Sequence, residues 1–398
     1  MKNAELEVTV RLRVQIPSVK PGLMKRQEVC PKEGCEGKHF KPHQKNCAKP
    51  LQDIEYDQVN VERWKCLRCK GTFRVYPEGV SEAQRSDRLK GANVLLYLLG
   101  LSYGGVEDFM GALGRPVGKT TVYRDVQAAG EQVRELREDW LGGQAGRVRV
   151  VGGDPTHVRC QGKDVIVGVT VDAEAGTTLD ICILDNEQAE TLTGWLKPMI
   201  EMVGARVLIT DDADGLKIAA DQAGVHHQVC RQHATPNLLA FIAEVADKVL
   251  TKPPAVPEGL DISVDQLLED LMMLEWIMLG HPGHGEKLLE QLYMRYALAP
   301  APKKGQRASI WYRMRNHILH LWENWKRLTC YRTLKHTEGL EVDATNNCSE
   351  RVIGWAVKER YRTMRGYKRK RSILNVTGLT AWLLDQPPGY QMSPLFAS

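Results

Sequence analysis

Residues 148–185, VRVVGGDPTHVRCQGKDVIVGVTVDAEAGTTLDICILD, decide the fold of this 398-residue chain. They contain three apolar, β-branched runs, VRVVGGD, DVIVGVTVD and TTLDICILD, with turn residues between them. Such runs predict three consecutive antiparallel strands, because connections this short cannot join parallel ones. Pro155 directly follows Asp154 and cannot donate a ladder hydrogen bond. We therefore expect a bulge or a local break there, absorbed by Gly152 and Gly153.

After this segment the pattern alternates between helix and strand. We expect a crossover helix, a short buried strand, a second helix and a further strand, at residues 187–203, 205–210, 215–223 and 225–230. His226 and His227 are expected to be residues of that last strand rather than metal ligands. Three antiparallel strands followed by alternating helix and strand is the order of an RNase H-like fold, so the predicted fold class is α/β with an RNase H-like core.

Three acidic residues stand at informative places in this pattern. Asp154 ends the first run, Asp211 ends the run ARVLITD, and Glu350 lies in TNNCSER within a helix-like, Arg-rich stretch. Carboxylates from two strands and one helix can bind a pair of divalent cations about 3.5 to 4 Å apart, which drive in-line attack on a phosphodiester. The sequence therefore predicts phosphoryl transfer on nucleic acid.

Neighbouring acids compete for two of these roles. Asp211 follows the apolar run directly, whereas Asp212 is expected to face the opposite way and Asp214 to begin the next helix. Glu350 begins an amphipathic helix, whereas the alternatives Glu338, Glu341 and Asp343 lie in a loop-like segment before it. We prefer Asp211 and Glu350, although a lone acid at such a position is more often a helix cap or a first-turn residue.

Cysteine spacing predicts a structural zinc site in the N-terminal third. Cys30 and Cys35 are followed by Cys66 and Cys69, and two such pairs about thirty residues apart can close a tetrahedral Zn²⁺ site in a zinc ribbon. His39, His43 and Cys47 are close enough in sequence to compete as ligands.

Helical periodicity follows the cysteines. Apolar residues recur at helical spacing over 89–101, over 106–113 and after Thr120, with Gly and Pro between the last two segments. This pattern favours a helix-turn-helix whose third helix presents Thr120, Thr121 and Arg124 to a DNA groove.

Charge is strongly segregated behind a formal net charge of +5. Residues 148–302 hold 11 Lys and Arg against 23 Asp and Glu, whereas 303–335 hold 9 against 1 and 350–371 hold 9 against 2. Basic blocks around an acidic centre are expected of a protein that binds polyanions beside a metal site. The best phosphate contacts are the basic residues of the last block, Lys358, Arg360, Arg362, Arg365, Lys368 and Arg369.

Apolar runs are too short to cross a bilayer, and the N-terminal MKNAELEVTVRLRV alternates like a strand without a signal-peptide core. We therefore expect a cytoplasmic protein with no membrane partner.

The chain resembles the DDE transposases of bacterial insertion sequences, specifically the Mutator-like group. Four stretches carry the resemblance in the expected order: GGDPTHVRCQGKDVIVGVTVDAEAGTTLDICILDNEQAETLTGWLKPM, ITDDADGLKIAA, HHQVCRQHATPNL and TNNCSERVIGWAVKERYRTMRGYKRKRS. It implies that Asp154, Asp211 and Glu350 form the DDE triad, with intervals of 57 and 139 positions. The long second interval is expected to hold an all-helical insertion.

The resemblance also implies the activity and the partners. Two Mg²⁺ or Mn²⁺ ions held by the triad would activate water to cut a strand at the element's end, and the freed 3′-hydroxyl would attack target DNA. The zinc ribbon and the helix-turn-helix would bind the terminal inverted repeats, and pairing two ends would need a homodimer or a larger homo-oligomer. Cys230 and His233, the Cys-x-x-His of the group, would be structural or positioning residues near the site. A nucleoid-associated, prokaryotic location follows from this role.

The expected domain order has five parts. They are a β unit with the zinc ribbon (1–80), the helix-turn-helix (81–146), the first part of the core (147–250), the helical insertion (251–344), and the final part of the core with basic C-terminal helices (345–398). Two alternatives remain: a domesticated DNA-binding regulator with the same N-terminal units, and an RNase H-type nuclease without strand transfer.

Overall fold

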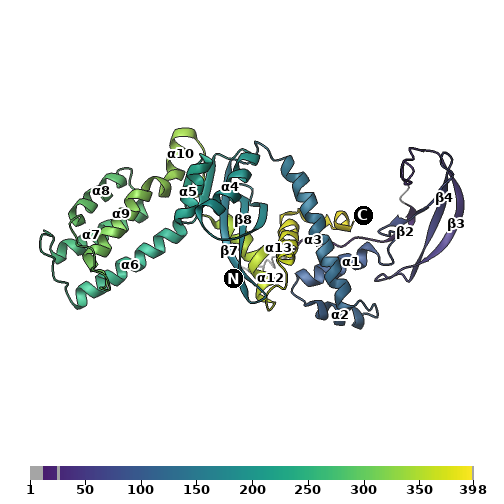
Figure 1. The fold of residues 1–398 in the computed structure, drawn as a ribbon, viewed down its shortest axis with the longest axis horizontal. Coiled ribbons are helices and arrows are strands. Elements are labelled where there is room, and N and C mark those ends of the chain that lie inside the picture. Colours follow the sequence, from purple (N-terminus) through teal and green to yellow (C-terminus); the bar gives the residue numbers. More distant parts are fainter. Residues whose placement is uncertain (1–11, 25–26, 397–398) are drawn as a thin grey trace, which may run out of the picture.

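A five-stranded mixed sheet forms the centre of the molecule (Figure 1). The computed structural model describes residues 12–24 and 27–396. The sheet contains β7 (Val150–Cys160), β8 (Lys163–Asp172), β9 (Thr177–Leu184), β10 (Val207–Thr210) and β11 (His226–Val229). Its order is β11-β10-β7-β8-β9, with β7, β8 and β9 antiparallel and β10 and β11 parallel to β7. This mixed α/β arrangement is consistent with an RNase H-like core.

The β7–β8 hairpin explains how the first strand extends past Pro155. Gln161 and Gly162 form its two-residue loop, and both have positive φ (53° and 77°), as a type I′ turn requires. The pairing of β7 with β8 runs without interruption from Val151 to Cys160, so the expected bulge or break at Pro155 is wrong. The pairing of β10 with β7 ends at Gly152, so Pro155 lies where β7 has lost that neighbour, which is an edge position that tolerates proline.

Helices cover both faces of the sheet. On one face, α4 (Ala189–Val203) and α5 (Asp214–Ala223) pack on the sheet through a cluster that includes Leu196 and Leu208. On the other face lie α3 (Lys119–Gly142), α11 (Asn347–Val352), the π-helical η1 (Ile353–Lys358), α12 (Glu359–Arg362) and α13 (Lys370–Asp385). Val167, Val169 and Ile373 belong to the buried cluster on this side.

A separate helical body lies beside the sheet, on the left in Figure 1. It consists of α6 (Arg231–Thr251), α7 (Val264–Gly280), α8 (Gly285–Tyr296) and α9 (Ile310–Leu328), packed around Phe241, Leu274 and Trp311. The helix α10 (Cys330–Glu338) then returns to the sheet, where Cys330 and Leu334 pack against Val207 and Ile209. Because α6 leaves β11 directly and packs in this body, the helical segment begins earlier than the expected residue 251.

The N-terminal segments lie at the opposite end of the molecule (Figure 1). A three-stranded antiparallel sheet contains β3 (Phe40–Pro50), β4 (Gln58–Cys66) and β5 (Thr72–Val75), and β2 (Lys20–Met24) pairs with β6 (Pro77–Glu78). The helices α1 (Asp87–Leu98) and α2 (Tyr103–Ala112) follow and pack on α3. None of the helices within residues 12–24 and 27–396 has the length and apolarity that crossing a bilayer requires.

Short elements close the chain onto itself. The strand β1 (Val14–Gln15) pairs in parallel with β12 (Tyr390–Gln391), ahead of the 3-10 helix η2 (Ser393–Phe396). Most of the strand expected at the N-terminus falls on residues 1–11, outside the described residues.

The helix α3 is joined firmly to the core. The Gly130 backbone lies so close to α13 that an added Cβ would meet the Asn375 carbonyl oxygen at 2.5 Å. The buried Arg137 side chain donates hydrogen bonds to the carbonyl oxygens of Thr178 on β9, at 2.5 Å, and of Gly378 on α13, at 3.5 Å. The middle and the C-terminal half of α3 are therefore fastened to the central sheet and to α13.

Candidate active site

Asp154 and Asp211 come from adjacent parallel strands in matching register. Val207, Leu208 and Ile209 of β10 pair with Val150, Val151 and Gly152 of β7. Continuing this one-to-one register by two residues sets Asp211 beside Asp154, and neighbouring strands lie about 4.8 Å apart. In-register residues of parallel strands point to the same face, so both carboxylates share one face of the sheet. Asp154 therefore lies within β7 rather than at the strand end that the sequence suggested.

The shared face is the one that α11 covers. A Cβ atom on Gly152 would lie 2.6 Å from Ser349 Oγ and 3.0 Å from Asn346 Oδ1, whereas one on Gly153 would meet Leu196 of α4. Alternate residues of a strand point to the same side, so Asp154 faces α11 together with Gly152. Glu350 belongs to α11, and its charge is close enough to raise the pKa of Asp154.

Asn346 fastens α11 to the sheet. Its Nδ2 donates a hydrogen bond to the carbonyl oxygen of Gly153 at 3.2 Å, and its backbone N–H donates to Cys230 Sγ at 3.2 Å. Its Oδ1 accepts a hydrogen bond from Ser349 Oγ at 2.7 Å. Sequence reasoning did not select this buried residue, although Asn directly before a helix is a common N-cap signal.

His233 lies between two of the acids. Its Nδ1 is 2.9 Å from Oδ1 of Asp211, and its Nε2 is 3.8 Å from Oε1 of Glu350. His233 belongs to the first turn of α6, which starts immediately after β11, the strand next to β10. The ring therefore holds the Asp211 carboxylate on the side that faces Glu350.

The carboxylates crowd one another in a half-buried site. Burial, together with the charges of Asp211, Glu350 and Glu187, raises the pKa of Asp154 to about 8. Burial also raises the pKa of Asp211, although His233 opposes this effect. A bound cation would relieve the repulsion between these partly buried carboxylates.

Asp212, the competitor of Asp211, is bound elsewhere. Its Oδ2 lies 2.5 Å from His320 Nε2 of α9, and its Oδ1 lies 2.6 Å from Lys217 Nζ of α5. Burial alone would raise the pKa of Asp212, but the hydrogen bonds from His320 and Lys217 lower it. No pattern in the sequence indicates the His320 contact, which joins residues 108 positions apart.

Two metal-binding chemistries compete at Asp211. Asp211, Cys230 and His233 place one ligand atom each within 4.8 Å of one another, a set suited to a transition metal. Cys230 is fully buried, burial raises the pKa of its thiol, and its sulfur already accepts the N–H of Asn346. The carboxylates of Asp154, Asp211 and Glu350 are instead hard oxygen donors, which suit Mg²⁺ or Mn²⁺. Oε1 of Glu350 is buried without a hydrogen-bond partner in the described part of the chain, as a ligand atom would be.

The four predicted zinc ligands lie together: Cys66 ends β4, Cys69 lies between β4 and β5, and Cys30 and Cys35 precede β3. The Sγ atoms of Cys30 and Cys69 are 3.8 Å apart, those of Cys35 and Cys66 are 3.9 Å apart, and all four lie within 4.8 Å of one another. Four sulfurs about 2.3 Å from a central Zn²⁺ would lie about 3.8 Å apart at the corners of a tetrahedron, so the cluster fits the ion. The competitor Cys47 packs with Val59 and Val61 instead.

The expected DNA contacts divide into exposed and buried residues. Thr120 and Arg124 at the start of α3 are exposed, and Thr121 is half-buried. In the C-terminal block Lys358 is half-buried, with its Nζ 2.6 Å from the carbonyl oxygen of His157, and the exposed residues are Arg362, Arg365, Lys368 and Arg369.

Arg360 is the expected DNA contact that the structure buries. It is 4% exposed, its guanidinium lies 4.1 Å from the centre of the Tyr97 ring, and it donates to the carbonyl oxygen of Leu101. The expectation that Arg360 contacts phosphate is corrected to a structural role that joins α12 to α1.

Comparisons with known proteins give distant structural neighbours. Two structures of the HTLV-2 integrase catalytic core domain in complex with magnesium, in trimeric and dimeric forms, match at 15% and 14% identity with TM-scores of 0.19 and 0.18. Each match covers 33% of this chain and 84% of the integrase chain. The simian T-cell lymphotropic virus intasome in complex with PP2A regulatory subunit B56 gamma matches at 14% identity and a TM-score of 0.19, over 33% of this chain and 48% of the other. No protein-family model and no curated protein matches the chain.

Proposed function

We propose that this protein is a DDE-type polynucleotidyl transferase that cuts and joins DNA. The observation that best supports this proposal is the register of β7 and β10, which, continued by two residues, is consistent with Asp154 and Asp211 as neighbours beneath the helix that carries Glu350. Burial is the main cause that raises the pKa of Asp154 to about 8, and the charges of Asp211 and Glu350 add to it, which supports a shared site for the three acids. Structural ion-pair networks also shift pKa values, but these three acids are not paired with Lys or Arg in any ion pair of the described residues.

The residues have separate roles in this proposal. Asp154, Asp211 and Glu350 would hold two Mg²⁺ or Mn²⁺ ions, which would supply activation of the attacking hydroxyl and stabilisation of charge on the entering and leaving oxygens. His233 orients the Asp211 carboxylate, and Asn346 fixes α11, and with it Glu350, on β7. The exposed basic residues that follow α12 hold the DNA backbone beside the acids.

The finer proposal is a transposase of a bacterial insertion sequence. The N-terminal sheet with its Cys₄ zinc site and the exposed start of α3 would bind the terminal inverted repeats, while the core cleaves a strand and transfers the 3′-hydroxyl to target DNA. The N-terminal sheet carries exposed Lys41, Lys45 and Arg68, which suit phosphate contacts. Pairing two ends would require a homodimer or a larger homo-oligomer.

Strand cleavage and joining test the proposal together. The full chain is incubated with Mg²⁺, a supercoiled target plasmid and end-labelled duplexes taken from the DNA that flanks its gene. We expect nicked ends with a free 3′-hydroxyl, and labelled ends joined to the plasmid. Asp211→Asn should lose both products. Asp185→Asn is the matched control, because Asp185 also follows a strand directly but is exposed, and it should retain both.

The outcomes separate the alternatives. Cleavage without joining would overturn the transferase in favour of an RNase H-type nuclease. Tight binding of the flanking DNA with no metal-dependent cleavage would favour a domesticated regulator. Joined products formed by the Asp211→Asn variant would show that Asp211 is not a catalytic residue and would overturn the proposed triad.

A further inference from the structure

The helical body is linked to both sequence neighbours of Asp211, to Asp212 directly and to Thr210 through His227 of β11. On one side, Asp212 Oδ2 lies 2.5 Å from Nε2 of His320 on α9. On the other side, Thr210 Oγ1 lies 2.8 Å from Nε2 of the buried His227, whose Nδ1 lies 3.0 Å from Nη1 of Arg327 on α9. A single helix from the insertion thus reaches the strand end before and after the proposed metal ligand.

The hydrogen bonds through His227 have only one consistent direction. A guanidinium can only donate, so Arg327 donates to Nδ1 of His227, and the proton of the neutral ring must be on Nε2. Nε2 therefore donates to Thr210 Oγ1, and Thr210 Oγ1 donates its own proton to the carbonyl oxygen of Asp211 at 2.9 Å. Burial and Arg327 lower the pKa of His227 to about 3, which agrees with a neutral ring. The relay therefore ends on the backbone of Asp211 itself.

The contacting face of α9 is built for this position. His320, Asn324 and Arg327 follow one another at helical spacing, so they share one face of the helix. The Asn324 side chain lies 3.4 Å from Nδ1 of His320 and donates to the His320 carbonyl oxygen, which orients the ring. Nη2 of Arg327 also donates to both carboxylate oxygens of Asp221 of α5, at 2.8 and 3.0 Å.

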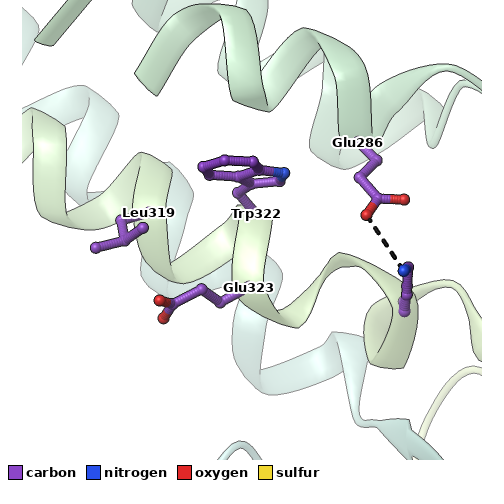
Figure 2. A pocket seen from close by; sticks show the side chains of 5 residues that line it. Glu286, Leu319, Trp322 and Glu323 are labelled. Carbon is purple, nitrogen blue, oxygen red and sulfur yellow. Dashed lines mark ion pairs between the residues drawn. The ribbon is translucent and has the colours of Figure 1, made fainter. Parts of the chain in front are cut away.

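Other faces of α9 hold it in the helical body. Trp311, Ile318 and Trp325 are buried in the cluster that α6 to α9 share. Figure 2 shows a further face, where Trp322 and Glu323 line a shallow pocket with Glu286 of α8. Because α9 packs within the body and also contacts the residues at the end of β10, the positions of the body and of that strand end are coupled.

We propose that α9 positions Asp211 for metal binding, with His320 and Arg327 as positioning residues that act through Asp212 and through the His227–Thr210 relay. This inference rests on the proposed function, in which Asp211 is a metal ligand. The insertion is then part of the active-site framework, and a displacement of α9 changes metal affinity without touching a ligand.

The affinity of the full chain for Mn²⁺, measured without DNA through the EPR signal of unbound Mn²⁺, tests the inference. His320→Leu and Arg327→Leu should each weaken Mn²⁺ binding about 10- to 100-fold, the usual effect of losing a residue that supports a metal ligand. His320→Gln keeps a donor for Asp212 and should recover most of the affinity. Arg313→Leu is the matched control. Like Arg327, Arg313 lies on α9 and donates to both oxygens of one carboxylate, but its partner Glu244 lies inside the body. This variant should bind Mn²⁺ like the natural chain.

A double variant separates this inference from the proposed function. If α9 acts through Asp211, Asp211→Ala combined with Arg327→Leu should bind Mn²⁺ no more weakly than Asp211→Ala alone. Unchanged binding in Asp211→Ala would overturn the proposed function. Lost binding in Asp211→Ala with unchanged binding in folded His320→Leu, as judged by its melting temperature, would overturn only the role of α9.

Discussion

The backbone of Gly152 lies directly beneath Ser349, so that a Cβ atom added to Gly152 would be 2.6 Å from Ser349 Oγ. Real Cβ atoms do not approach a heavy atom this closely, so a side chain at Gly152 must displace the Ser349 side chain, the Val171 methyl group 2.9 Å away, or α11 as a whole. Since α11 carries Glu350 and β7 carries Asp154, this contact sets the separation of two of the three acids.

Gly152→Ala should therefore reduce strand cleavage strongly and lower the free energy of unfolding by about 1 to 3 kcal/mol, as overpacking does. Ser349→Ala added to it should restore part of the activity, because it removes the nearest atom. Gly194→Ala on α4, where an added Cβ meets nothing within 4 Å, should leave cleavage unchanged. Equal cleavage by Gly152→Ala and Gly194→Ala would contradict the placement of α11.

Metal binding should depend on pH through Asp154. Burial and the neighbouring acids raise its pKa to about 8 in the folded protein, against about 3.9 in an unfolded chain. Between about pH 4 and 8 the Asp154 carboxyl is therefore protonated in the folded protein and ionised in the unfolded chain. Its contribution to the free energy of unfolding is fully present below about pH 4 and is lost as the pH rises to about 8. Asp154→Asn should make the melting temperature of the metal-free protein depend less on pH.

Metal binding should release the proton of Asp154. Calorimetry of Mn²⁺ binding at pH 7 should therefore detect released protons, and fewer of them for Asp154→Asn.

Much of the core follows from sequence alone. The runs of Val and Ile predicted β7, β8 and β9, and the apolar run before Asp211 correctly predicted a strand that ends at Thr210. These elements are predictable because burial of one apolar face dictates their pattern. The continuation of β7 through Pro155 was not predictable, since it depends on where the neighbouring strand β10 ends.

The features that could not be predicted from the sequence depend on contacts between segments that are distant in the chain. The helix α6 was not predicted, because Pro236 interrupts its second turn and only packing in the helical body reveals it. The contact of Asp212 with His320 and the stacking of Arg360 on Tyr97 join segments that are distant in the chain. A basic residue in an Arg-rich run has the same sequence signal whether it is buried or exposed.

Zinc should be needed for the N-terminal sheet and not for the core. A thiol-reactive zinc assay should release one Zn²⁺ per chain, and Cys66→Ala should lose it. Backbone N–H groups of Cys69 and Arg68 lower the pKa of Cys66 to about 7, so this thiol ionises readily for a metal. Hydrogen exchange should show loss of protection in β3, β4 and β5 of Cys66→Ala, with β7 to β9 unaffected. Protection that stays unchanged without zinc would contradict a structural site.

Arg360 and Arg362 should behave differently although only one residue separates them. Arg360→Ala leaves the Tyr97 face and the Leu101 carbonyl without their partner, so its melting temperature should fall. Arg362→Ala removes an exposed cation, so it should melt normally but bind DNA with a salt slope that is lower by about one. Melting curves and DNA binding over a series of salt concentrations check both expectations. A normal melting temperature in Arg360→Ala would argue against its structural role.

The sharpest test of the proposed active site is the position of bound metal. Crystals of the full chain with Mn²⁺, measured at the manganese absorption edge, should show two anomalous peaks about 3.5 to 4 Å apart. Asp154 and Asp211 should contact these ions together with Glu350. An ion bound by Asp211, Cys230 and His233, with none in contact with Asp154 in a protein that still cleaves DNA, would contradict it.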